Sequence, residues 1–131
     1  MAEETLVKEA LTDQMIEAGA SVVDSLAKRG FAVDAALWLY LPDLNRWRLY
    51  LAMPEVRAKG PKKAYQRVLR SLRDIPGMAL DDVSVVDSDD PFIRMFRGAL
   101  RADRSPNGVR LSRGAINGQF VEDAYVYRTA A

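Results

Sequence analysis

The chain has 131 residues, with 19 basic and 18 acidic side chains and a formal net charge of +1. It contains neither cysteine nor histidine, which excludes disulfides, thiol nucleophiles, Ser-His triads and every Cys/His metal site. At this length a single α+β domain over residues 1–131 can bury enough apolar surface to fold without such cross-links.

The first predicted element is an amphipathic helix that ends before Gly30. Gly30 is a typical residue just beyond a helix C-terminus. Gly19, in the middle, weakens the helix by about 1 kcal/mol relative to Ala. Simple tolerance is the favoured explanation for it, and close approach of a strand or a partner subunit is the alternative. The apolar stripe has Val7 and Val23 at its edges and recurs at helical spacing through Leu11, Met15, Val22 and Leu26.

The next two predicted strands form a hairpin within residues 31–53. In "FAVDAALWLYL" and "RWRLYLAM" the odd-numbered positions are apolar, so the pattern predicts that they share one face of the sheet. A three-residue loop, 43–45, meets this condition. The other face then carries aromatic residues and an arginine, with Trp38 opposite Tyr50 and Tyr40 opposite Arg48.

The remaining elements complete a predicted order of α-β-β-α-β-α-β-β. Gly60-Pro61 opens a second helix, whose buried stripe includes Tyr65 and Leu69, and "VSVV" at 83–86 is predicted as an interior strand. Asp90-Pro91 begins a third helix. The stretch "GVRLSRGAI-NG-QFVEDAYVYR" indicates a hairpin, because Asn-Gly is a strong turn signal. The predicted fold is therefore a two-layer α+β sandwich, with three helices and a five-stranded mixed sheet.

Basic residues gather in two blocks: residues 46–80 carry nine of them against two acidic residues, and residues 94–114 carry six against one. Together with the aromatic face, these blocks favour a surface for a second copy, another protein or single-stranded nucleic acid. The alternative is that a helix covers the aromatic residues as core, and that the basic helix face is only solvated. The predicted partner-binding residues are Trp38, Tyr40, Arg48, Tyr50, Arg67, Arg70, Tyr125 and Tyr127.

An acidic run follows the third predicted strand. Carboxylates at a strand end can hold Mg²⁺ and activate water against a phosphate ester, so Asp87, Asp89 and Asp90 are predicted metal ligands. They define the alternative function, a metal-dependent phosphoesterase or nuclease. The competing interpretation is that these residues only cap the helix that begins at Pro91.

Three phrases, "FAVDAALWLY…RWRLYLA", "VSVVDSDDPF" and above all the C-terminal "INGQFVEDAYVYR", resemble a family of small uncharacterised bacterial α+β proteins. The resemblance covers the whole chain and implies no activity, ligand or site residue. No apolar run approaches the ~20 residues of a membrane span, and the acidic start is unlike a secretory leader. We therefore predict a cytoplasmic, non-enzymatic binding or regulatory module, a homodimer with no cofactor and no membrane partner.

Overall fold

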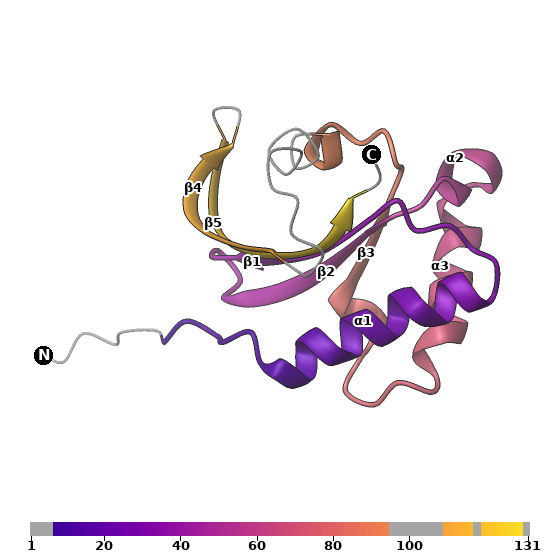
Figure 1. The fold of residues 1–131 in the computed structure, drawn as a ribbon, viewed down its shortest axis with the longest axis horizontal. Coiled ribbons are helices and arrows are strands. Elements are labelled where there is room, and N and C mark those ends of the chain that lie inside the picture. Colours follow the sequence, from indigo (N-terminus) through magenta and orange to yellow (C-terminus); the bar gives the residue numbers. More distant parts are fainter. Residues whose placement is uncertain (1–6, 95–108, 117–118, 130–131) are drawn as a thin grey trace, which may run out of the picture.

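A computed structural model describes residues 7–94, 109–116 and 119–129 of the chain. Helices lie on a single mixed sheet with the strand order β3-β2-β1-β5-β4 (Figure 1), which confirms the α+β class. Neighbouring strands are antiparallel except β2 and β3, which are parallel. The helical elements are α1 (Asp13–Lys28), α2 (Glu55–Lys59), α3 (Pro61–Leu72) and a 3₁₀ turn (Leu80–Asp82). The strands are β1 (Ala35–Leu41), β2 (Arg46–Ala52), β3 (Val83–Val86), β4 (Val109–Ile116) and β5 (Gln119–Thr129).

Helix α1 begins later than its apolar stripe suggested. The Thr12 hydroxyl accepts a hydrogen bond from the Met15 N–H at 3.1 Å, which caps the helix at its first turn. Val7 and Leu11 therefore belong to a non-helical segment, residues 7–12, that we call the N-terminal arm. The arm lies beside the turn between β1 and β2 before it enters α1 (Figure 1).

The predicted parity of the first hairpin is wrong. The observed register pairs Trp38 with Leu49 and Tyr40 with Trp47, because the turn contains the four residues 42–45 and not three. Within this turn Asn45 adopts a left-handed conformation with φ 46°, which Asn tolerates better than most residues. One additional turn residue moves every side chain of β2 to the opposite face relative to β1. Trp38 and Trp47 thus share a face.

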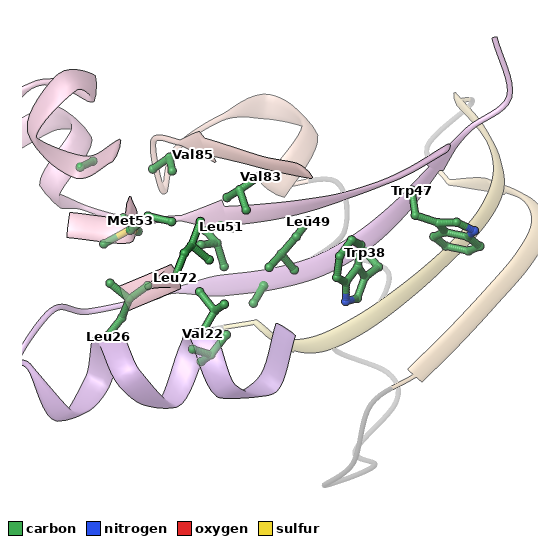
Figure 2. Packing of buried hydrophobic residues seen from close by; sticks show 14 of the residues in the cluster. Val22, Leu26, Trp38, Trp47, Leu49, Leu51, Met53, Leu72, Val83 and Val85 are labelled. Carbon is green, nitrogen blue, oxygen red and sulfur yellow. The ribbon is translucent and has the colours of Figure 1, made fainter. Parts of the chain in front are cut away.

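This face of the sheet packs against α1 and α3. Figure 2 shows Val22 and Leu26 of α1 pointing toward Leu49 and Leu51 of β2. Burial of each such side chain is worth about 1.5–3 kcal/mol. The α1 side of the sheet is therefore the main core, and its buried residues include Val22, Leu26, Trp38, Tyr40, Trp47, Leu49, Leu51, Val68 and Val83.

Helix α1 approaches the sheet closely at Gly19. A β-carbon there would collide with the Tyr127 hydroxyl and lie 2.8 Å from Trp38 Nε1. The same two side chains bond to each other, since Trp38 Nε1 donates to the Tyr127 hydroxyl at 2.7 Å. That hydroxyl in turn donates to the Ile16 carbonyl of α1 at 2.6 Å. Close approach of a strand therefore explains Gly19, and simple tolerance does not.

The opposite face of the sheet is also buried. A helical turn at 91–94 lies on this side (Figure 1), where Ile93 is fully buried beside Leu37 and the Phe92 ring lies 5.7 Å from that of Tyr50. Elements of the described chain thus cover both faces, so the predicted two-layer arrangement is incomplete. The remainder of the third predicted helix and the predicted Asn117-Gly118 turn lie outside the described residues, although the flanking strands β4 and β5 do pair as a hairpin.

The sequence pattern predicted β3 as an interior strand, but it lies at the edge of the sheet. The Tyr65 hydroxyl of α3 accepts a hydrogen bond from the Val85 N–H at 3.0 Å, so a side chain takes the place of a further strand at that point. Helix α3 begins at Pro61 as predicted. Leu69 was expected in its buried stripe but is 42% exposed.

Candidate functional site

The eight predicted partner-binding residues are divided between the two faces of the sheet and helix α3. Arg48 and Tyr50 lie on the sheet face opposite α1, because the register places them beside Leu39 and Leu37. The core interpretation is correct for Trp38 and Tyr40, which are 1% and 7% exposed. No continuous aromatic–arginine surface forms across the first hairpin. The α1 face holds Trp38, Tyr40, Tyr125 and Tyr127, and α3 carries Arg67 and Arg70.

The first candidate region lies on the α1 face of the sheet and contains a buried carboxylate, Asp123, whose side chain is 5% exposed. Arg110 Nε and Nη2 each donate to one of its oxygens at 2.6 Å, and Lys8 Nζ donates at 2.8 Å. Burial by itself raises the pKa of Asp123, but the hydrogen bonds from Arg110 and Lys8 outweigh it and lower the pKa to about 2. Asp123 therefore stays ionised and anchors two cations at one point on the sheet.

Aromatic rings complete the surroundings of these cations. Lys8 Nζ lies 4.7 Å from the centre of the Tyr40 ring and 5.8 Å from that of Trp47, and the Arg110 guanidinium lies 5.3 Å from that of Trp47. Cations over ring faces are attracted by the ring quadrupole. Tyr40, Trp47 and Asp123 thus form an ammonium cage, which in this structure holds Lys8.

Backbone groups of the N-terminal arm bond to the same end of the sheet. The Asn45 side-chain amide donates to the Val7 carbonyl at 3.0 Å and accepts from the Glu9 N–H at 2.9 Å. Trp47 Nε1 donates to the Glu9 carbonyl at 2.8 Å. Three backbone groups of the arm are therefore held by side chains, on either side of the residue that fills the cage.

The second region is the basic outer face of α2 and α3. Helix α3 contains no acidic residue. Arg67 is half-buried, since it pairs with Glu55 at 3.5 Å and its guanidinium lies 4.7 Å from the Phe31 ring. Five other cations are exposed and take part in none of the ion pairs within the described residues: Lys59, Lys62, Lys63, Arg70 and Arg73.

A hollow of about 430 Å³ lies at the β3 edge of the sheet, where Tyr65 is the residue of α3 in its lining. Arg46, Arg48, Tyr65 and Ser84 line it together with Leu80, Asp81 and Val83. Arg46 pairs with Asp82 at 3.0 Å, whereas Arg48 makes a long 3.4 Å contact with the Ser84 hydroxyl. Arg48 Nε is buried and has no hydrogen-bond acceptor within the described residues. The hollow therefore contains a cation whose hydrogen-bonding capacity is incompletely used.

The third region is the acidic run. Arg57 contacts Asp87 at 3.0 Å and Asp89 at 2.8 Å, and Asp90 Oδ1 accepts from the Phe92 N–H at 2.9 Å at the start of the helical turn. Over 7–94 and the described strand residues that follow, no group of three acidic side chains is placed to hold a metal ion. The capping interpretation is correct for Asp90, and the geometry gives the predicted metal site no support.

Sequence reasoning missed Lys8, Asn45 and Trp47 as members of the Asp123 region. One signal was available: pairing of Arg110 with Tyr125 places Arg110 diagonally from Asp123 across the hairpin, within reach of a long side chain. Lys8 is separated from Asp123 by 115 residues, and no local pattern connects them.

The chain was compared with protein-family models, with curated proteins and with solved structures, and none of them matches it. The resemblance to a bacterial family therefore stays a prediction. None of the helices within the described ranges is long and apolar enough to cross a membrane.

Proposed function

We propose that the protein is a small non-enzymatic binding module that holds single-stranded nucleic acid on the basic face of α2 and α3. The observation that carries this proposal is the set of five exposed cations on that face, which pair with no carboxylate of the described chain. Phosphate groups are the natural partners of such a surface, because each contact releases counterions from the strand.

The hollow beside α3 supplies groups for the rest of a nucleotide. Lys62 and Leu69 lie one turn before and one turn after Tyr65 along α3, so a cation, an aromatic ring and an exposed apolar side chain follow one another. Single strands bind where a basic groove adjoins rings on which bases stack. In this arrangement Arg48 receives a phosphate at the hollow, and Tyr65 and Leu69 contact a base.

The test is the anisotropy of a fluorescent mixed-sequence oligonucleotide titrated with the full chain at several salt concentrations. We expect binding at low salt that weakens linearly with the logarithm of salt concentration. The double variant Lys62→Glu/Lys63→Glu should weaken binding at least tenfold and reduce the slope by about 1 to 1.5, since single strands contribute roughly 0.7 per phosphate contact.

A matched control changes the net charge equally at another exposed helix end. Lys28→Glu/Arg29→Glu at the end of α1 should leave the affinity within twofold of the unmodified chain. Absence of binding at low salt, or equal losses in both double variants, would contradict the proposal. Equally tight binding of polyglutamate would show instead that the basic face takes an acidic protein partner.

We also infer a cytoplasmic location. A chain without cysteine gains nothing from an oxidising compartment, where small proteins commonly rely on disulfides.

A further inference from the structure

The N-terminal arm is bound in the way that peptide-recognition surfaces bind their ligands. Such surfaces hold an extended peptide through its backbone and select one side chain in a pocket. Here the Asn45 amide bonds to the Val7 carbonyl and to the Glu9 N–H. The residue between them, Lys8, places its ammonium group against Asp123 at 2.8 Å.

Lys8 brings its ammonium group to this cage from an extended segment of the chain. A compact lysine head fits between two rings and one carboxylate, and the attraction of rings for a cation adds to the ion pair. Arg110 already occupies both oxygens of Asp123 from the other side. Lys8 Nζ donates to the Oδ2 atom of the same carboxylate, which thus binds two cations.

The contacts of the arm do not depend on its belonging to the same chain. The arm forms neither helix nor strand, and the side-chain partners of Val7, Lys8 and Glu9 lie 36 to 115 residues away in sequence. An arm of this kind can make identical contacts on a second copy, which is a low-cost route to a symmetric dimer.

Two exposed apolar side chains lie at the same place. Val7 is 82% exposed and Leu44 is 60% exposed, the two highest values among large hydrophobic residues in the described ranges. They flank one contact, because the Val7 carbonyl bonds to Asn45, the residue next to Leu44. Within the described residues of one chain both side chains stay exposed, and a second copy at this end of the sheet could cover them.

We propose that two copies of the chain exchange their N-terminal arms, so that Lys8 of one copy fills the cage of Tyr40, Trp47 and Asp123 in the other. The product is a homodimer closed by two identical arm contacts. This inference is independent of nucleic-acid binding, since it uses none of the residues of α2 and α3.

Complementation tests the exchange. Lys8→Ala removes the ammonium group and leaves the cage intact, whereas Asp123→Asn alters the cage and leaves the arm intact. Analytical ultracentrifugation of the unmodified chain should show a dimer, and each variant alone should dissociate at least tenfold more readily. An equimolar mixture should form more dimer than either variant alone, because one complete arm contact is regained. A mixture that equals the average of its components, or a monomeric unmodified chain, overturns the proposal.

The absence of cysteine from the chain permits a second test that does not require Asp123 to be changed. Glu9 and Arg46 line a common hollow of about 440 Å³, so the double variant Glu9→Cys/Arg46→Cys places one thiol on the arm and one on the sheet. Oxidation should produce a covalent dimer that a reductant separates, and each single-cysteine variant is the control. An intramolecular disulfide in a monomer, or thiols that stay free, contradicts the exchange.

Discussion

Asp123 and the pair Asp87 and Asp89 are each held by an arginine, but in different surroundings. The Asp123 side chain is 5% exposed, whereas Asp87 and Asp89 are 29% and 42% exposed and share an Arg57 side chain that is 66% exposed. A clearly lowered pKa accompanies the first arrangement. We therefore expect the two clusters to contribute differently to stability, because water screens the exposed carboxylates of the second more than the buried carboxylate of the first.

The difference arises from what lies around the charges. Rings of Tyr40 and Trp47 lie against the cations that bind Asp123, whereas those cations keep 41% and 45% of their side-chain surface exposed. The Arg57 cluster lies between the short α2 and the loop after β3, and Arg94 of the helical turn also contacts Asp89 at 3.6 Å. The comparison suggests that the Asp123 cluster contributes to stability and that the Arg57 cluster mainly orients a loop.

The largest expected effect comes from Asp123→Asn. This change leaves Arg110 and Lys8 without their carboxylate in a partly buried site, which should lower the free energy of unfolding by about 3 kcal/mol. Urea denaturation monitored by tryptophan fluorescence measures it. Asp89→Asn is the matched control and should cost less than about 1 kcal/mol; equal losses at both positions would remove the contrast.

Acid should weaken the fold through the same carboxylate. The pKa of Asp123 is about 2 in the folded chain and about 3.9 when unfolded, so its contribution is complete above the unfolded value. We expect about 2 kcal/mol to be lost as the pH falls from about 5 to about 2. Stability curves of the unmodified chain and of Asp123→Asn should converge over this interval. Parallel curves would show that Asp123 does not titrate in this way.

A buried polar group without charge gives a smaller effect on the same side of the sheet. Tyr127→Phe leaves Trp38 Nε1 and the Ile16 carbonyl without the hydroxyl that joins them, at a cost of about 1–2 kcal/mol. Thermal unfolding measures the change. Tyr50→Phe, on the opposite face, is the control and should cost under about 0.5 kcal/mol; a Tyr127→Phe chain as stable as the control would show that this bond is replaced by water.

The smallest effect is expected for Arg57→Ala. Since its side chain is largely exposed, removal should change the free energy of unfolding by at most about 1 kcal/mol. The loss should disappear at high salt, because exposed ion pairs are screened. A salt-independent loss of several kcal/mol would show that the acidic run is a structural centre comparable to Asp123.

Local signals predicted several elements well. Pro61 begins α3 because its missing N–H costs nothing at the first helical position, and Asp90 caps the turn that follows the acidic run. The pairing of Ile116 with Gln119 agrees with the hairpin that the Asn-Gly sequence indicated. Each of these features depends on residues within a few positions of one another.

The register of β1 and β2 could not be predicted in the same way. The segment "AALWLYL" is apolar at every position, so its alternation does not distinguish the face under α1 from the face beside Ile93. Only the turn length decides the parity, and three-residue and four-residue turns were both compatible with "PDLN". The predicted aromatic surface required a three-residue turn, and the one additional residue in the observed turn removes it.

The sequence by itself determined the α+β class, most element positions and the absence of any chemistry that needs cysteine or histidine. These follow from composition and from short-range spacing. Tertiary structure decided which face the tryptophans occupy, which cations reach Asp123 and where the arm lies. Those contacts join residues up to 115 positions apart, and their energies depend on the exclusion of water, which the folded chain alone creates.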